Sequence, residues 1–207
     1  NYYETQLSKL GVRVVKNKEI TENSPELNGA DKIILATGAT GFIPPIRGAE
    51  NSNVLEVIDA HTGDQSRIGH KVVVAGGGPS GCDCAIELAM EGKDVTLVEM
   101  LPEIYPTATP DNKNSVMRRI GEENIHVLTS AKVKEFTPKG AVVETADGVK
   151  DLTADTVIVA MGTKPNTKIA KAISDRYTNA LMIGDCTQIG QVGEAVREGF
   201  MAAWTID

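Results

Sequence analysis

Three glycines with a fixed spacing are the residues of this sequence that point most directly to chemistry. Gly76, Gly78 and Gly81 form a G-x-G-x-x-G pattern immediately after residues 72–75, an apolar run typical of a strand buried in a parallel sheet. In such a pattern the first glycine permits a tight turn, the second lets the backbone approach a diphosphate, and the third lets a helix pack on the strand. The pattern therefore predicts a turn that binds a nucleotide diphosphate.

The residues that follow supply the helix, the strand and the acid that such a turn needs. Pro79 and Ser80 open a helix, whose unpaired N–H groups and positive dipole end hold a diphosphate without a cationic side chain. The helix ends near Gly92, and a second strand over residues 95–98 ends at Glu99. The order of these elements favours a dinucleotide site over a merely structural turn.

Glu99 indicates which dinucleotide binds. It lies 23 residues after Gly76, where a carboxylate accepts hydrogen bonds from the adenosine ribose and repels a 2′-phosphate. No arginine directly follows Glu99; its neighbour is Met100, which we also place in the site. We therefore expect NAD(H) rather than NADP(H) as the cofactor.

Composition and charge exclude several classes of protein. The 207 residues suffice for one large or two small domains, and 41% of them are apolar. The net charge of −7 implies no basic surface for nucleic acid, and no apolar run approaches the roughly 20 residues that span a bilayer. The first ten residues lack the features of a signal peptide, so we expect a cytoplasmic protein with neither nucleic acid nor membrane as a partner.

Apolar runs and turn signals predict the remaining elements. The expected strands cover residues 12–15, 31–38, 125–128, 155–162 and 181–185, and the expected helices cover 3–10, 54–60, 115–122 and 192–206. Three short alternating runs, separated by glycine-containing turns, predict an antiparallel three-stranded meander at 133–136, 141–145 and 149–152.

Two parts of the sequence repeat each other. Residues 30–38, ADKIILATG, match residues 154–162, ADTVIVAMG, and the helix-strand pair at 3–15 matches the pair at 116–128. We therefore expect two nucleotide-binding units. The second is complete, whereas the glycine fingerprint of the first would precede the printed sequence, so we expect a fragment of a longer enzyme.

With these repeated strand-glycine turns, the GGGPSG run and Ile183-Gly184-Asp185 in view, the sequence resembles the two-dinucleotide-binding-domain flavoproteins, the FAD/NAD(P)-binding pyridine nucleotide-disulfide oxidoreductase superfamily. IGDC followed by GEAVREGFMAAWTID is most similar to the C-terminal part of NADH:flavin oxidoreductases of the 2-enoate reductase and 2,4-dienoyl-CoA reductase type. The resemblance implies an α/β fold of Rossmann-like three-layer domains. An NAD-binding domain over 65–164 would be inserted in a partial FAD-binding domain over 1–64 and 165–207.

The resemblance also implies roles for individual residues. Thr37 and Gly38 would lie on the diphosphate side of FAD, and Asp185, preceded by Gly184, would accept a hydrogen bond from the ribityl chain. Gly162 would belong to the NAD site. The last helix would aim its positive end at the flavin, where negative charge develops on reduction. Hydride would pass from nicotinamide C4 to flavin N5, so we assign no catalytic acid or base.

In this family the full chain begins with a barrel that holds FMN and a cysteine cluster that holds a 4Fe-4S centre. Neither is in these residues, so we expect an NADH:flavin oxidoreductase fragment that retains an NAD site, binds FAD poorly and leaves the final substrate to a missing N-terminal oxidoreductase domain. One alternative is a module that holds ADP or NAD without turnover, as in trimethylamine dehydrogenase-like proteins. A disulfide reductase half is a weaker alternative, since its thiol pair is not seen.

The cysteines and histidines have plain interpretations. Cys82 and Cys84 could suggest a redox pair at a helix start, but residues two apart point to opposite sides of a helix, so we interpret them as core residues. Cys186 fits a small packed residue. The three histidines show no metal-ligand spacing, and we expect no metal. Glu194 and Arg197, in the first turns of the last helix, could face either flavin or solvent.

Overall fold

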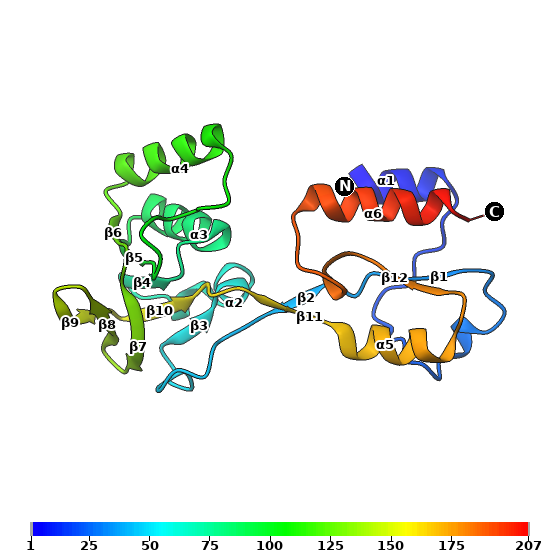
Figure 1. The fold of residues 1–207 in the computed structure, drawn as a ribbon, viewed down its shortest axis with the longest axis horizontal. Helices are drawn as coiled ribbons and strands as arrows, with labels where there is room; N and C mark the ends of the chain where they lie inside the picture. The colour runs from blue at the N-terminus through cyan, green and yellow to red at the C-terminus, as the bar shows by residue number, and fades with distance from the viewer. Residues whose placement is uncertain (1, 207) are drawn as a thin grey trace. The chain divides into compact units, whose positions relative to one another are not determined.

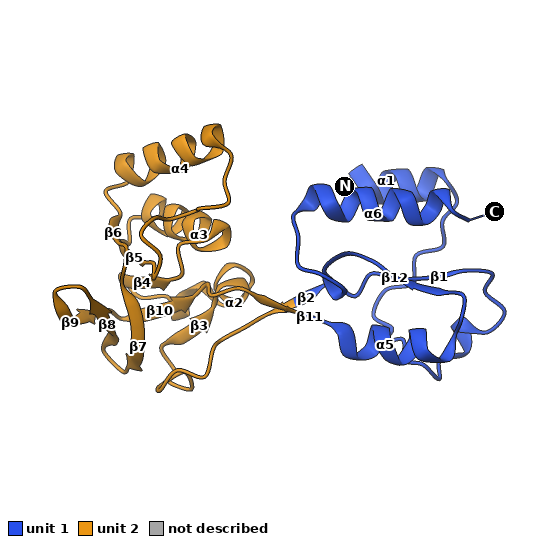
Figure 2. Cartoon of the chain, viewed as in Figure 1, with its two compact units in different colours: residues 1–39, 165–207 blue, residues 40–164 orange. Residues whose placement is uncertain are grey.

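The computed structural model describes residues 2–206 and divides the chain into two compact units (Figures 1 and 2). Unit 1 comprises residues 1–39 and 165–207, and unit 2 comprises residues 40–164. The sequence predicted the first boundary at residue 64. The structure moves it because β3 (Val54–Glu56) pairs with β10 (Thr156–Val159), so residues 40–64 fold with unit 2.

Unit 2 is built on a five-stranded parallel sheet with the order β3-β10-β4-β5-β6. The three strands besides β3 and β10 are β4 (Lys71–Ala75), β5 (Asp94–Val98) and β6 (His126–Leu128). Val74 on β4 and Ile158 on β10 are completely buried. Both faces of such a strand are covered, so its sequence is an unbroken apolar run.

Helices cover one face of this sheet and the meander covers the other (Figure 1). The helices are α2 (Val57–Thr62), α3 (Pro79–Met90) and α4 (Pro110–Glu122); the meander strands are β7 (Lys132–Thr137), β8 (Gly140–Thr145) and β9 (Gly148–Thr153). Leu97 is buried on the helical side, and Phe136 is buried on the meander side. This is the predicted arrangement of parallel sheet, helices and antiparallel meander.

Two short segments carry the chain between the units. They are β2 (Ala39–Gly41) and β11 (Thr163–Pro165), which pair as a two-stranded sheet. Phe42 donates a backbone hydrogen bond of 3.2 Å to the carbonyl of Gly162, and the Lys164 ammonium lies 3.6 Å from the centre of the Phe42 ring. These contacts stabilise the connection where it enters unit 2.

Unit 1 has a smaller sheet, in which β1 (Ile33–Leu35) pairs in parallel with β12 (Ala180–Met182). Its helices are α1 (Tyr2–Lys9), α5 (Thr167–Arg176) and α6 (Val192–Trp204). A core of apolar residues joins the sheet to α5, with Ile173 2% exposed. Short 3-10 helices occur in both units: η1 (Pro25–Leu27), η2 (Gln65–Arg67) and η3 (Gly184–Cys186).

Three elements differ from the sequence prediction. Residues 12–15 form no strand, because no neighbouring strand pairs with them, and Val15 is 60% exposed. The expected helix over 54–60 is instead strand β3 followed by α2. Helix α5 was not predicted. Among the described residues, no helix is long and apolar enough to cross a membrane.

Candidate nucleotide-binding site

A cavity of about 620 Å³ lies in unit 2 at the carboxyl ends of the parallel strands. Its size suits a small-molecule site, which typically measures about 300–1,000 Å³. In open α/β sheets, ligands bind where neighbouring strands lead the chain to opposite sides. Here β4 leads to β5 on one side, and β10 lies on the other side with β3 beyond it. The lining residues are Pro44, Ile46, Val57, Gly76, Gly78, Pro79, Ser80, Val98, Glu99, Met100, Ala131, Lys132, Val133, Ala160, Met161, Gly162 and Thr163.

The glycine turn after β4 has room for a ligand at one position only. Gly76 has a φ of +118°, and a Cβ there would stand 2.3 Å from the carbonyl oxygen of Ala160. A Cβ at Gly81 would stand 1.8 Å from the carbonyl oxygen of Gly76, so the third glycine is needed for the helix to pack against the turn. A Cβ at Gly78 would meet nothing within 4 Å. The backbone at Gly78 is therefore open to a diphosphate, which is the fit that the spacing predicts.

Helix α3 begins at this turn with its N–H groups open to an anion. Gly78 is the N-cap residue and has no side chain to accept from them, and Pro79 starts the helix. The first turn contains no acidic side chain. Unpaired N–H groups and the positive end of the helix dipole favour a negatively charged group here.

Glu99 ties the glycine turn to the end of β5. Its carboxylate is 8% exposed, and its two oxygens accept hydrogen bonds of 2.7 Å from the backbone N–H groups of Gly77 and Leu101. A buried carboxylate needs such donors, because an unpaired charge is costly away from water. Each oxygen keeps a further lone pair, so the carboxylate can still accept from a ribose hydroxyl.

The structure brings most of the predicted NAD residues together. Those that line the cavity are Gly76, Gly78, Pro79, Ser80, Glu99, Met100 and Gly162. Gly81 lies beneath the turn and packs against Gly76. Sequence reasoning missed Val57, the first residue of α2, and Lys132, the first residue of β7, because local spacing does not show which distant elements meet at the cavity.

The predicted FAD residues lie in unit 1 and are not among those that line this cavity. Gly38 and Gly184 both have a φ of +67°, which favours glycine. The Thr37 hydroxyl donates to the carbonyl of Asn166 at 3.0 Å, and Asp185 Oδ1 accepts from the backbone N–H of Gly190 at 3.1 Å. The glycine conformations suit sharp turns at strand ends, and the FAD roles of these residues remain predictions.

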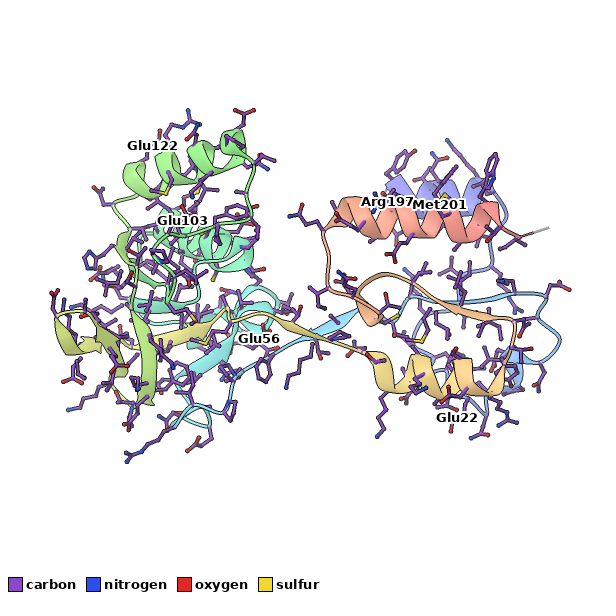
Figure 3. All side chains as sticks on the ribbon, in the orientation of Figure 1. Glu22, Glu56, Glu103, Glu122, Arg197 and Met201 are labelled. Atoms are coloured by element: carbon purple, nitrogen blue, oxygen red, sulfur yellow. The ribbon has the colours of Figure 1, made fainter. Side chains whose placement is uncertain are left out.

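The structure gives Glu194 and Arg197, in the first turns of α6, different surroundings. Glu194 Oε2 accepts a hydrogen bond of 2.9 Å from the backbone N–H of Gln191 and forms a capping box with it. Glu194 therefore has a structural role at the start of the helix. Arg197 is exposed on α6 (Figure 3).

The cysteines are core residues, as the sequence predicted. Cys82 and Cys84 are 0% and 1% exposed, and burial raises the pKa of both thiols to about 12. Cys186 is also buried, with Sγ 3.3 Å from the carbonyl oxygen of Leu35. No group of three or more metal-ligating side chains occurs within residues 2–206.

The family assignment follows from comparison with known sequences. The profile of the family described as "Pyridine nucleotide-disulphide oxidoreductase" matches residues 1–199. The chain belongs to this family. Its members are oxidoreductases that bind FAD and NAD(P)H.

Similar proteins within the pyridine nucleotide-disulphide oxidoreductase family include two bacterial enzymes. An NADH oxidase of Thermoanaerobacter brockii is 33% identical over 211 residues, which cover all of this chain and 32% of the relative. A cinnamate reductase of Clostridium sporogenes is 28% identical over 208 residues, which cover 99% of this chain and 31% of the relative. The chain thus spans about a third of the length of these relatives.

A solved structure extends the match to the whole fold. A complex of 2-naphthoyl-CoA reductase superposes with a TM-score of 0.92 and 29% sequence identity, over 99% of this chain and 31% of the other. Both units of the chain therefore have counterparts in that structure.

Proposed function

We propose that this chain is the electron-input part of an NADH-dependent flavin oxidoreductase. It binds NADH in unit 2 and passes hydride to FAD. The observation that carries the proposal is the cavity at the carboxyl ends of β4, β5 and β10, with the open glycine turn at its centre and Glu99 at its β5 end. When bound, the two cofactors supply the hydride chemistry, and the protein supplies position and electrostatic field.

The cavity offers a separate place for each part of NADH. The turn at Gly78 and the start of α3 bind the diphosphate, and Glu99 accepts from the adenosine ribose. The far wall, toward β10, is formed by apolar side chains together with Gly162 and Thr163. We place the nicotinamide against this wall.

We assign the parent enzyme to the 2-enoate reductase and 2,4-dienoyl-CoA reductase type. The names of the similar proteins support this, since they include an NADH oxidase, a cinnamate reductase and a 2-naphthoyl-CoA reductase. The relatives are about three times as long, which leaves room for a further oxidoreductase domain that holds the substrate. In unit 1, Thr37, Gly38, Gly184 and Asp185 would contact FAD.

A second candidate is a module that holds a nucleotide without turnover. The open glycine turn and the Glu99 carboxylate, which bind the diphosphate and the adenosine ribose, are satisfied by ADP alone. The two functions differ in whether the nicotinamide half contributes to binding.

Calorimetric titration of the chain with NADH, NADPH and ADP distinguishes these candidates. The electron-input function predicts that NADH binds at least about tenfold more tightly than NADPH or ADP. Equal binding of ADP and NADH would favour the nucleotide-holding module. Absence of binding by all three would contradict both.

A further inference from the structure

Thr163 lines the far wall of the cavity as the first residue of β11. Two segments build this wall next to the pairing of β2 with β11 (Figure 1): the segment after β10, and the segment after β2 that supplies Pro44 and Ile46. The backbone N–H of Phe42 donates to the carbonyl of Gly162 at 3.2 Å and holds the two segments together. Contacts within unit 2 therefore set the position of Thr163 in the wall.

The side chain of Thr163 points away from the contact that its neighbour Lys164 makes. The Lys164 ammonium lies over the Phe42 ring, 3.6 Å from its centre. Successive side chains of a strand point to opposite faces, so Thr163 lies on the face opposite to Lys164. Neither Lys164 nor Phe42 lines the cavity, whereas Thr163 does. The side chain of Thr163 is therefore directed to the cavity.

The hydroxyl of Thr163 is available to a ligand. Thr163 is exposed, and within residues 2–206 its hydroxyl has no hydrogen-bond partner. By contrast, the hydroxyls of Thr37, before β2, and Thr167, after β11, donate to backbone carbonyls at 3.0 and 3.2 Å. A threonine hydroxyl can donate one hydrogen bond and accept two. At Thr163 this whole capacity is left for a molecule in the cavity.

The strand order sets the direction of a bound dinucleotide. In the proposed function its diphosphate lies at the turn after β4 and its adenosine lies toward β5 and Glu99, so its nicotinamide extends toward β10. The other side chains that line the cavity at that end are those of Pro44, Ile46, Val57, Ala160 and Met161. Of these only the Met161 thioether accepts a hydrogen bond, and it is a weak acceptor. Among the described side chains that line this end, Thr163 thus carries the one strong hydrogen-bonding group.

We propose that the Thr163 hydroxyl accepts a hydrogen bond from the carboxamide N–H2 of the bound nicotinamide, so that Thr163 selects a dinucleotide with an intact carboxamide. The inference rests on the proposed function and names a residue that determines its specificity. An apolar wall without this hydroxyl would leave the N–H2 group unpaired, which is costly away from water. Because threonine is branched at Cβ, its χ1 torsion is restricted, and little side-chain entropy is lost on binding.

Three ligands isolate this contact in calorimetric titrations of the chain. NADH carries the carboxamide, the reduced form of 3-acetylpyridine adenine dinucleotide has a methyl group in place of the N–H2, and ADP-ribose lacks the ring. We expect NADH to bind about three- to tenfold more tightly than the acetylpyridine analogue, which corresponds to one hydrogen bond between neutral groups.

Two substitutions of Thr163 separate its hydroxyl from its shape. Thr163→Val keeps the branched shape but removes the hydroxyl, and should reduce the preference for NADH over the analogue to less than about twofold, with ADP-ribose binding unchanged. Thr163→Ser keeps the hydroxyl and should retain a preference of at least about threefold. Thr153→Val is the matched control, since Thr153 is also an exposed strand residue and does not line the cavity. It should leave the preference intact.

Each other result counts against a defined claim. An unchanged preference in Thr163→Val, no preference in the unaltered chain, or loss of the preference in Thr163→Ser overturns the role of the hydroxyl, while tighter binding of NADH than of ADP-ribose still supports the proposed function. Equal weakening of all three ligands by Thr163→Val shows a structural role only and also overturns it. If the unaltered chain binds none of the three ligands, the proposed function fails and the inference fails with it.

Discussion

The Glu99 carboxylate accepts a 2.7 Å hydrogen bond from the backbone N–H of Gly77, and this contact joins the end of β5 to the glycine turn after β4. The second oxygen accepts from Leu101 at the same distance. Glu99 thus stabilises the glycine turn, in addition to the contact with the adenosine ribose that the sequence predicts for it. In the proposed function, the ligand selectivity and the stability of the site depend on the same side chain.

Replacing Glu99 should therefore weaken both folding and binding. Glu99→Ala leaves the buried N–H group of Gly77 and the partly buried N–H group of Leu101 without acceptors, so we expect the free energy of unfolding of unit 2 to fall by about 2–4 kcal/mol. NADH binding should fall at least tenfold, with the preference over NADPH lost. Urea unfolding and calorimetry measure the two effects.

Glu103→Ala provides the control for this experiment. Glu103 pairs with Lys113 at the surface and is half exposed (Figure 3), so its removal should cost less than about 1 kcal/mol. An equal loss of stability in both variants would show that the buried Glu99 carboxylate does not stabilise the glycine turn.

Two glycines of the fingerprint should respond differently to the same substitution. Gly81→Ala places a Cβ 1.8 Å from the carbonyl oxygen of Gly76, so the helix must move and stability should fall by about 2 kcal/mol or more. Gly78→Ala meets no protein atom within 4 Å, so stability should change by less than about 1 kcal/mol. Its methyl group points into the space for the diphosphate.

For Gly78→Ala, binding should change strongly although stability changes little. We expect its affinity for ADP and NADH to drop about tenfold or more while its unfolding midpoint in urea stays near that of the unaltered chain. Unchanged affinity would show that the diphosphate does not lie against this turn.

Local spacing was sufficient to predict the glycine turn and Glu99, because the elements that form them are adjacent in sequence. Spacing could not reveal Val57, at the start of α2, or Lys132, at the start of β7, because they reach the cavity only through the packing of elements that are far apart in the sequence. The valines at 12–15 have a strand pattern but no neighbouring strand, so tertiary context overrides their propensity. The helix α5, with its buried residues Ala170 and Ile173, was not predicted, because the apolar strand patterns before and after it are stronger signals.

Burial of the two helix cysteines predicts a loss of stability at alkaline pH. Their pKa is raised to about 12 in the folded protein, whereas an unfolded thiol titrates near 8.5. Below about pH 8.5 both states hold the proton and these thiols add no pH dependence. Above it the unfolded state loses protons first, so stability falls by about 1.4 kcal/mol per pH unit for each thiol until the folded pKa is reached.

Urea unfolding between pH 8 and 10.5 tests this, with Cys84→Ala as the comparison. The fall in the free energy of unfolding with rising pH should be smaller in Cys84→Ala than in the unaltered chain, by the contribution of one thiol. Parallel declines in the two proteins would show that Cys84 does not contribute. At pH 8 the folded chain should also resist thiol reagents, and all three cysteines should react in urea.

The nucleotide site should persist in residues 40–164 produced alone. All residues that line the cavity come from this continuous segment, and both core clusters of the parallel sheet are contained within it. We expect it to unfold cooperatively in urea and to bind NADH within about twofold of the affinity of the whole chain, since every residue that lines the cavity belongs to this segment. A segment that folds but binds NADH more than tenfold weaker would show that unit 1 contributes directly to the dinucleotide site.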